Sequence, residues 1–406
     1  MKRKRTPKIA IVLRRVLIGS FALSVLAVGG VYLYTRSLTD ASAQSAATPV
    51  PTEASAAPTP AVTVTPTPVV TPTPSPTPVP TPTPTPEPVV ILLSSAGDCT
   101  LGGDANSGTI RRFEQYAEKN GYDYYFRNVA DIFLSDDITV VNLEGPLTNA
   151  TQRRSGRQFN FRGNPDNVQL LTGVEVCSFA NNHALDFLQQ GMDDTQAAVE
   201  EAGMGIFGFS LEYYTDVKGV TMGFLGLTQW QYELDEVSQM VAAAKEKCDI
   251  LIVTIHWGEE RQYKPSSIQN KYAMAIIDAG GDLVLGNHSH VIGAIRQYNG
   301  KYIVYNHGNF CFGGNGNPKD KNCFIFQQAF VVHHDGTVED GGISVIPCSV
   351  SSVKDKNNFQ PTPLTGDAAR QVLLDIAKYS EADLSQYKWL DSFIGYELGL
   401  FEEESE

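Results

Sequence analysis

The sequence predicts an α/β domain that begins near residue 89 and follows an N-terminal transmembrane helix and a proline-rich stalk. Two observations predict this class. Continuous apolar runs, which are typical of strands buried on both faces, alternate along the chain with amphipathic helical runs. Motifs that contain histidine, carboxylate or asparagine come directly after several of the apolar runs. Because binding sites in open α/β sheets form where the strands end, these motifs indicate one shared site.

The N-terminal segment predicts a membrane anchor. Residues 1–15 are rich in Lys and Arg, and residues 16–34 are apolar and carry no charge. About 20 apolar residues can span a bilayer as a helix, and a basic flank predicts that residues 1–15 stay in the cytoplasm. We therefore expect a single-pass protein of the cell membrane whose C-terminal domain is extracytoplasmic. The alternative is a secreted protein, released by signal cleavage near Ala43.

Residues 35–88 consist largely of Thr-Pro repeats. Proline removes a backbone donor and fixes φ, so neither a helix nor a sheet is expected there. Proline-rich chains extend by about 3.1 Å per residue as polyproline II, which predicts a disordered but semi-rigid linker. The linker would hold the following domain away from the membrane.

The domain after residue 88 is acidic. Eight of the 31 basic residues lie in residues 1–36, and three of the 45 acidic residues lie in residues 37–88. This leaves 23 basic and 42 acidic residues, a balance of −19, for the domain. A nucleic-acid binder neutralises phosphates with a basic surface, so no nucleic-acid partner is expected.

The predicted elements alternate between strands and helices. Strands are expected at residues 89–95, 138–142, 174–179, 219–227, 250–255, 282–285, 293–298, 302–306, 324–333 and 342–347. Helices are expected at residues 111–120, 129–134, 189–202, 236–247, 266–279 and 367–380. Gly300-Lys301 is expected to form a hairpin turn. We assign residues 89–350 to the main domain and residues 351–406 to a partly helical C-terminal extension.

Five polar motifs follow predicted strands. They are Gly97-Asp98, Asn142-Leu143-Glu144-Gly145, Asn181-Asn182-His183, His256-Trp257-Gly258-Glu259 and Gly286-Asn287-His288-Ser289-His290. Imidazole, carboxylate and amide oxygen are ligands for divalent metals such as Zn, Mn and Fe. A single histidine after a strand is more often a hydrogen-bonded structural residue, but four in three such motifs favour a metal centre. Asp98 and Glu144 have another reading, as helix caps or partners of arginine.

The order GD, NLEG, NNH, HWG, HxH and YxxGNF resembles the CapA family of poly-γ-glutamate capsule synthesis proteins. That family is similar to the calcineurin-like metallophosphoesterases. The resemblance covers the chain from Val89 to Pro347, most of the predicted domain. It implies a four-layer α/β/β/α metallophosphoesterase-like sandwich with two facing sheets.

The resemblance also implies a role for each motif residue. Asp98 and His290 would bind the first of two divalent metals, and Glu144 would bridge them. The second metal would be bound by Asn182, His256 and His288. His183 would touch the substrate and donate a proton or stabilise the transition state. Asn309 would contribute to substrate binding, and His307 would add a polar residue to the wall of the site.

One departure weakens the first metal site. The superfamily places a histidine two residues after the first aspartate, whereas Cys99-Thr100 follows Asp98 here. The bridging residue is also Glu rather than Asp. These differences predict one firmly bound metal ion and a second that is bound weakly.

Four arginines, at positions 153, 154, 157 and 162, cluster between the second and third motifs. In an acidic domain, such a cluster favours binding of an anionic substrate, and we assign this role to Arg153, Arg157 and Arg162. Arg162→Ala would then weaken substrate binding without unfolding the domain. The alternative is a solvated loop whose arginines pair with surface acids.

The resemblance implies a membrane-anchored protein of poly-γ-glutamate (capsule) biosynthesis or processing that contacts the polymer and the membrane synthase subunits. Its metal centre predicts a hydrolase or transferase in which metal-bound hydroxide attacks an anionic substrate, at a phosphoester or a γ-amide. The alternative is a non-catalytic scaffold that retains the metal fold to hold polymer or synthase partners. His183 favours the enzyme, since a scaffold needs no proton donor. For an exported protein, Cys311 and Cys323 are the best candidates for a disulfide.

Overall fold

The computed structural model describes residues 87–381, 387, 388 and 390. The larger of its sheets has the order β16-β15-β14-β1-β3-β5-β6, with β13 beside β1. Its strands are β1 (Val89–Thr100), β3 (Ile138–Leu143), β5 (Val176–Ser178), β6 (Gly205–Phe207), β13 (Asn309–Phe312), β14 (Asn322–Val332), β15 (Val338–Ser349) and β16 (Thr362–Pro363). The four strands from β1 to β6 run parallel, so their carboxyl ends share one edge.

The smaller sheet has the order β11-β12-β10-β9-β8-β7. Its strands are β7 (Glu212–Val217), β8 (Val220–Thr228), β9 (Ile250–His256), β10 (Leu283–Asn287), β11 (Ile295–Tyr298) and β12 (Lys301–Val304). Here β8, β9, β10 and β12 run parallel. A separate short pair joins β2 (Gly103–Asp104) to β4 (Phe161–Arg162). Each main sheet therefore offers a row of parallel strand ends.

The two sheets pack face to face. Inward-facing side chains of the larger sheet, such as Ile91 and Val140, form one apolar cluster with Phe224, Ile252 and Leu283 of the smaller sheet. All five are at most 2% exposed. At about 25 cal/mol per Å² of apolar area removed from water, burial of this kind is the main term that holds the sheets together.

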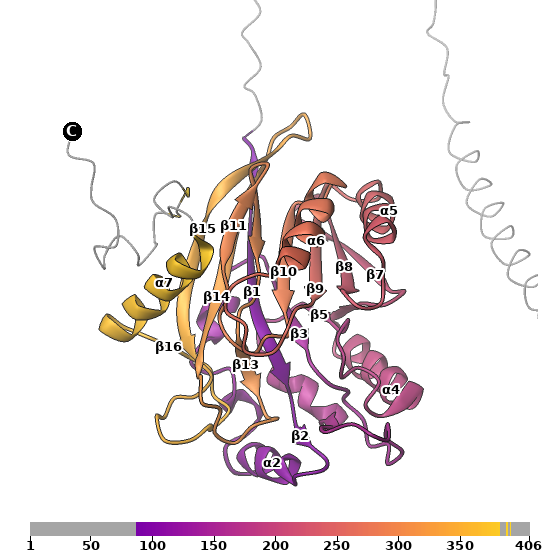
Figure 1. The fold of residues 1–406 in the computed structure, drawn as a ribbon, viewed down its shortest axis with the longest axis vertical. Coiled ribbons are helices and arrows are strands. Elements are labelled where there is room, and N and C mark those ends of the chain that lie inside the picture. The colour runs from indigo at the N-terminus through magenta and orange to yellow at the C-terminus, as the bar shows by residue number, and fades with distance from the viewer. Residues whose placement is uncertain (1–86, 382–386, 389, 391–406) are drawn as a thin grey trace, which may run out of the picture. The chain divides into compact units, whose positions relative to one another are not determined.

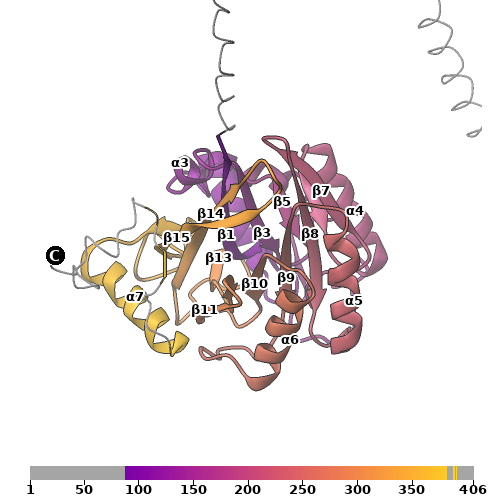
Figure 2. The same cartoon turned by 90° about the horizontal axis from the view of Figure 1, so that it is seen from above.

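Helices cover both outer faces (Figures 1 and 2). The helices are α2 (Thr109–Asn120), α3 (Ala130–Phe133), α4 (Leu188–Glu201), α5 (Leu234–Lys245), α6 (Ser267–Asp278) and α7 (Gly366–Ser380), with 3-10 turns η1 (Tyr122–Tyr124) and η2 (Pro165–Leu170). Phe113 and Val199 bring α2 and α4 into the apolar cluster behind the larger sheet. Val241 and Ile276 bring α5 and α6 into the cluster behind the smaller sheet. The layers thus run helix, sheet, sheet, helix.

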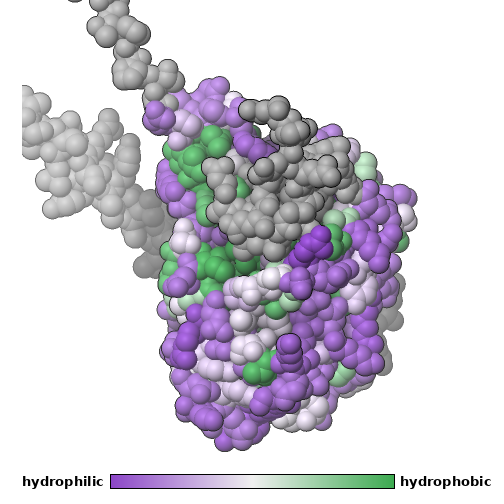
Figure 3. All heavy atoms as spheres, turned by 90° about the vertical axis from the view of Figure 1, so that its left-hand side faces the viewer, coloured by the Kyte–Doolittle hydropathy of each residue, from purple (hydrophilic) through white to green (hydrophobic). Residues whose placement is uncertain are grey.

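Helix α7 lies in the part of the chain predicted as a C-terminal extension. Its side chains Val372, Leu373 and Ile376 belong to the cluster between the sheets, so this helix is part of the main core. The face of the molecule on the α7 side is mostly hydrophilic, with a few apolar areas (Figure 3).

Most predicted elements agree with the observed ones to within a few residues. Helix α6 begins where predicted because Ser266 caps it. Gln269 N donates to Ser266 Oγ at 3.2 Å, and Ser266 N donates to Gln269 Oε1 at 2.9 Å. The hairpin turn was predicted one residue too late. It lies at Asn299-Gly300, where both residues have positive φ, and β12 already begins at Lys301.

Several short strands were not predicted from the sequence. Strand β7 reads Glu-Tyr-Tyr-Thr-Asp-Val and lies at the edge of its sheet with only Val217 buried, so it lacks the apolar run of a buried strand. Strands β6 and β13 have only three and four residues; β6 pairs with the equally short β5, and β13 pairs with the long strand β1. Tertiary pairing decides such segments more than local propensity does.

The predicted disulfide between Cys311 and Cys323 is wrong. All six cysteines, which lie within the described residues, are free thiols. Cys311 Sγ donates to Phe359 O at 3.5 Å, whereas Cys323 lies opposite Cys348 in the pairing of β14 with β15. The two thiols therefore have different neighbours, although they lie at the two ends of the same loop.

The predicted cytoplasmic segment 1–15 and transmembrane segment 16–34 lie outside the described residues, as does the predicted linker up to residue 86. In the portion of the chain that the structure describes, no helix has the length and apolar character needed to cross a bilayer.

Candidate metal centre

The predicted ligands meet at the carboxyl ends of the parallel strands. Asp98 lies near the end of β1, at an irregularity in its pairing, and Glu144 directly follows β3. His256 is the last residue of β9 and pairs with Asn287, so His288 follows at the same level. Gly97 permits this arrangement, because a Cβ there would lie 1.9 Å from Gly308 O.

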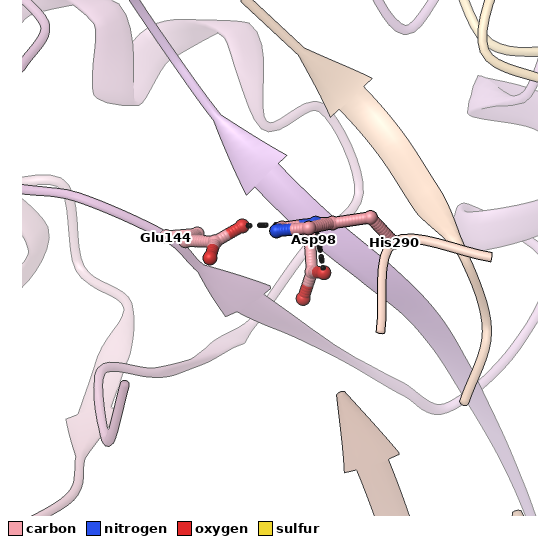
Figure 4. Close-up of side chains that lie close together, drawn as sticks. All are labelled: Asp98, Glu144 and His290. Atoms are coloured by element: carbon pink, nitrogen blue, oxygen red, sulfur yellow. Dashed lines mark ion pairs between the residues drawn. The ribbon is translucent and has the colours of Figure 1, made fainter. Parts of the chain in front are cut away.

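Asp98, Glu144 and His290 form a first cluster, whose ligand atoms lie within 4.8 Å of one another. His290 Nδ1 is 3.1 Å from Asp98 Oδ2 and 3.8 Å from Glu144 Oε2. Figure 4 shows the imidazole between the two carboxylates, which come from neighbouring strands. One imidazole and two carboxylates make a suitable set of ligands for a divalent ion.

Asn182, His256 and His288 form a second cluster. His256 Nε2 lies 2.9 Å from Asn182 Oδ1 and 3.1 Å from His288 Nδ1. The same nitrogen is 3.7 Å from Glu144 Oε1. Glu144 therefore has one oxygen nearest each cluster, which is the position of a carboxylate that bridges two ions.

Glu144 supplies the direct test of whether a metal fits. The residue is fully buried, and neither carboxylate oxygen has a hydrogen-bond partner among the described residues. Burial and the Asp98 carboxylate raise the Glu144 pKa well above its usual value. A buried carboxylate without donors is costly, and a cation between the two clusters would remove that cost. The residues present therefore fit one or two divalent ions.

The imidazoles of the two clusters differ in protonation. Burial, together with the other histidines, lowers the His256 pKa well below its usual value and the His288 pKa to about 4. Burial would also lower the His290 pKa, but the Glu144 and Asp98 carboxylates outweigh it and raise that pKa to about 10. The second cluster thus holds neutral imidazoles ready for coordination, whereas the first must release a proton before His290 can bind a metal.

His183 lies in the third motif but outside both clusters. Its Nδ1 is 2.6 Å from Asp186 Oδ2, and its ring packs 4.2 Å from the ring of Phe161. Asp186 is fully buried and also accepts a hydrogen bond from Phe161 N at 2.7 Å. An imidazole that donates from Nδ1 to a fixed carboxylate keeps Nε2 for another partner. The contact of His183 with substrate stays a prediction.

A row of amide side chains supports the ligands, and the sequence did not single it out. Asn142 Nδ2 donates to Asp98 Oδ1 at 2.7 Å, and Asn181 Nδ2 donates to Asn142 Oδ1 at 3.3 Å. Asn181 Oδ1 accepts from His183 N at 3.1 Å. The sequence could have pointed to Asn142, because it lies in the same motif as Glu144, two residues earlier.

Two polar contacts join the sheets beneath the clusters. Ser178 Oγ and Thr254 Oγ1 are 2.7 Å apart, linking β5 to β9. His307 is 2.9 Å from Ser95 Oγ and 3.2 Å from Gly286 O, linking β1 to β10. His307 is only 1% exposed, and its ring contacts both sheets; its predicted place in the wall of the site stays a prediction. Burial lowers its pKa to about 4.

Asn309 contacts a predicted ligand. Its Oδ1 lies 2.9 Å from His290 Nδ1, and its Nδ2 donates to His290 O at 3.3 Å. The amide therefore orients His290, whose backbone has a positive φ of 59°. A direct role of Asn309 in substrate binding stays a prediction.

The arginines predicted to bind substrate have three different environments. Arg157 Nη2 donates to Asn182 O at 2.8 Å, which places this guanidinium beside the second cluster. Arg162 Nη1 donates to Ala150 O at 2.6 Å, and its guanidinium lies 5.3 Å from the ring centre of Phe187. Arg153 is exposed. Arg162 thus supports the loop, and Arg157 is the arginine that the structure brings to the site.

Trp230 is a further residue that the sequence did not single out. It follows the end of β8, and its ring centre lies 5.2 Å from that of His288. The sequence could have pointed to Trp230 through its place three residues after the predicted strand 219–227, but an indole is not a usual metal ligand.

Solved structures share only a loose likeness with this chain. The protein TT1561 of Thermus thermophilus has a TM-score of 0.32 at 11% identity, covering 62% of this chain and 99% of that one. The purple acid phosphatase PPD1 of yellow lupin has a TM-score of 0.31 at 10% identity, covering 72% and 57% of the two chains. Scores of this size carry no argument about activity.

Three sequence relatives are closer. The PGA biosynthesis protein CapA of Bacillus subtilis (strain 168) is 29% identical over 308 residues, 70% of this chain and 76% of that protein. The capsule biosynthesis protein CapA of Bacillus anthracis is 27% identical over 68% of this chain and 74% of that protein. A probable polyglutamine synthesis accessory protein of Mycobacterium tuberculosis (strain H37Rv) is 31% identical over 42% and 54%.

A family model described as bacterial capsule synthesis protein PGA_cap matches residues 93–314. This span contains both ligand clusters, His183 and Asp186. Because it covers more than half of the 406-residue sequence, the chain belongs to the PGA_cap family of bacterial capsule synthesis proteins.

Proposed function

We propose that this protein is a membrane-anchored, extracytoplasmic, metal-dependent hydrolase or transferase that acts on an anionic polymer in poly-γ-glutamate biosynthesis or processing. The observation that carries the proposal is Glu144, a buried carboxylate without hydrogen-bond donors that lies between two ligand clusters. Neither oxygen has a hydrogen-bond donor among the described residues, and a divalent ion at this position would satisfy both. The anchor is residues 16–34, as predicted from their length and apolar character.

Each cluster has the ligands for one ion. Asp98 and His290, with Asn309 orienting the imidazole, would hold the first, and the second cluster would hold the other, with Glu144 shared. A divalent ion in such a site supplies Lewis-acid polarisation of a substrate oxygen and lowers the pKa of coordinated water. Zn, Mn and Fe all accept this mixture of imidazole and oxygen ligands, so the ligands do not choose among them.

His183 would move the proton. Asp186 fixes the imidazole through Nδ1, so Nε2 is the atom that would donate to a leaving group or a developing negative oxygen. Phe161 covers the ring on one side, at 4.2 Å between ring centres, and limits the directions in which the ring can turn. The dyad therefore fixes Nε2 as the ring atom that would exchange a proton with the substrate.

The substrate class follows from charge and from relatives. The domain has a balance of −19, yet Arg157 lies against Asn182 in the second cluster, where an anionic group would meet it. One relative is named for PGA biosynthesis and another for capsule biosynthesis. That polymer contains amides and carboxylates, so cleavage or transfer at a γ-amide is the reaction we propose, with phosphoester hydrolysis as the competing reaction.

The test uses the full-length protein in detergent with its native metal content measured by elemental analysis. Wild type, His183→Ala and His256→Ala are assayed with a γ-linked oligoglutamate and with a phosphodiester. We expect His256→Ala to lose metal and turnover, and His183→Ala to keep its metal but lose about 10²-fold or more in turnover. Turnover of the phosphodiester alone would move the substrate class from amide to phosphoester.

One observation favours a second function, that of a scaffold for synthase subunits and polymer. The first cluster has a single imidazole, because Cys99-Thr100 replaces the histidine of the superfamily motif. A relative is also named as an accessory protein. Metal bound to the wild type, with no turnover of either substrate and with retained binding of polymer, would support the scaffold and reject the enzyme.

A further inference from the structure

Trp230 is an exposed indole that lies directly beside the second cluster. The residue is 51% exposed, and its ring centre lies 5.2 Å from that of His288 and 6.0 Å from that of His256, edge to face in both cases. An indole in contact with water forgoes the free energy that its burial would release. Half-exposed tryptophans are accordingly enriched where proteins bind other molecules.

The turn that carries Trp230 is fixed by hydrogen bonds. Gln231 N donates to Thr228 O at 3.2 Å, and Thr228 Oγ1 donates to Gln231 Oε1 at 3.1 Å. Gln229 N donates to His256 O at 3.1 Å, and Gln229 Oε1 accepts from Gly258 N at 3.2 Å. These bonds fasten the end of β8 to the end of β9. The turn that carries the indole is therefore preformed, which lowers the entropy cost of binding.

Arg157 contacts the same cluster from a different element. Its guanidinium donates to Asn182 O at 2.8 Å, and Asn182 Oδ1 lies 2.9 Å from His256 Nε2. Arg157 contacts Asn182, Asn182 contacts His256, and His256 contacts Trp230. The guanidinium of Arg157 and the indole of Trp230 therefore lie on different sides of the second cluster. A ligand that bridges them needs an anionic group and an apolar stretch.

We propose that Trp230 is a docking subsite for the apolar stretches of a γ-linked glutamyl chain, next to the bond that reacts. The inference rests on the proposed function, because it names how that site recognises its substrate. In a γ-linked chain the methylene groups lie in the main chain and each carboxylate is attached directly to it. Methylene groups pack on the indole, and the carboxylate pairs with Arg157. An α-linked chain has an amide main chain with its carboxylates at side-chain ends, and fits this spacing less well.

The test is calorimetric titration of full-length wild type, Trp230→Ala and Trp230→Phe with a γ-linked oligoglutamate. We expect Trp230→Ala to raise Kd about 5- to 30-fold, which corresponds to about 1–2 kcal/mol. Trp230→Phe keeps an aromatic face and should stay within about 3-fold of wild type. The matched control is Leu134→Ala, an apolar side chain 65% exposed at the end of α3, which should leave Kd unchanged.

Fluorescence gives a readout that does not depend on turnover. The sequence has three tryptophans, of which Trp257 is buried and donates from Nε1 to Tyr305 O. Addition of the γ-linked oligomer should change the emission of wild type and leave that of Trp230→Phe nearly unchanged. If Trp230→Ala loses its metal or has a lower melting temperature, the comparison of emission between wild type and Trp230→Phe tests the subsite instead.

The outcomes separate this inference from the one on which it rests. Wild type that binds no γ-linked oligoglutamate would refute both. Wild type that binds it, with Trp230→Ala binding equally well, would refute the subsite and leave the proposed function standing. An equal loss of affinity for α-linked and γ-linked chains in Trp230→Ala would overturn the claim that the indole reads the γ-linkage.

Discussion

Glu144→Gln should stabilise the metal-free protein while it removes the stabilisation by metal. The carboxylate is fully buried, neither oxygen has a hydrogen-bond partner among the described residues, and the Asp98 carboxylate lies nearby. Glutamine has nearly the same shape but no charge. Relief of an unsatisfied buried charge is worth about 1–3 kcal/mol, and at about 2 °C per kcal/mol for a domain of this size the metal-free melting temperature should rise about 2–6 °C.

Metal should stabilise wild type more than the variant. At a concentration 100 times Kd, a ligand stabilises the folded state by about 2.7 kcal/mol. If loss of the shared carboxylate weakens binding about 100-fold, the same concentration stabilises the variant by only about 0.4 kcal/mol. Wild type should melt below the variant with chelator, and metal should then close that gap by about 2.3 kcal/mol. Thermal scans with and without a chelator measure both differences.

The pH dependence gives a further check on Glu144. Its folded-state pKa is raised above the value of 4.5 expected for the unfolded chain. The folded state therefore loses stability as pH rises above 4.5, until the folded pKa is passed. The metal-free advantage of Glu144→Gln should therefore grow as pH rises above 4.5 and shrink as pH falls toward 4.5.

Glu175→Gln is the matched control, because Glu175 is half-buried with a raised pKa but lies at the other end of β3, where it accepts from Thr139 N at 2.8 Å. It should leave the response to metal unchanged. A Glu144→Gln protein that melts below wild type in chelator at pH 8, and that gains as much as wild type from metal, would contradict the reasoning.

Three other outcomes are expected. Asp186→Asn should keep its metal content but lose about 10²-fold in turnover, and nitrogen NMR of His183 should show a changed tautomer; unchanged turnover would contradict the dyad. Filling the first cluster at pH 7.5 should release about one proton, from His290 with its pKa of about 10, whereas the second should release almost none; calorimetry in buffers of different ionisation enthalpy measures this. The double variant Ser178→Ala with Thr254→Val should bind metal about 10-fold more weakly with little change in metal-free melting, since it removes a contact between the sheets just beneath the second cluster.

The sequence alone determined which residues lie at strand ends. The apolar runs located the strands that deliver Asp98, Glu144 and His256, because a strand buried on both faces must be apolar throughout and its polar successors are visible in sequence. Parallel neighbours share an edge, so the meeting of these side chains could be inferred without coordinates. Family resemblance added the division into two ligand sets.

Only the tertiary structure decided how the two sheets face each other. That packing brings Asn182 of one sheet to His256 of the other and leaves Glu144 without donors, and neither fact is local to a segment. It also places His307 in the core and Asn309 at the ligands, although they are two residues apart. Short-range patterns specify a strand and its faces, whereas the contacts between faces depend on packing of residues far apart in sequence, and these contacts decide what each side chain can bind.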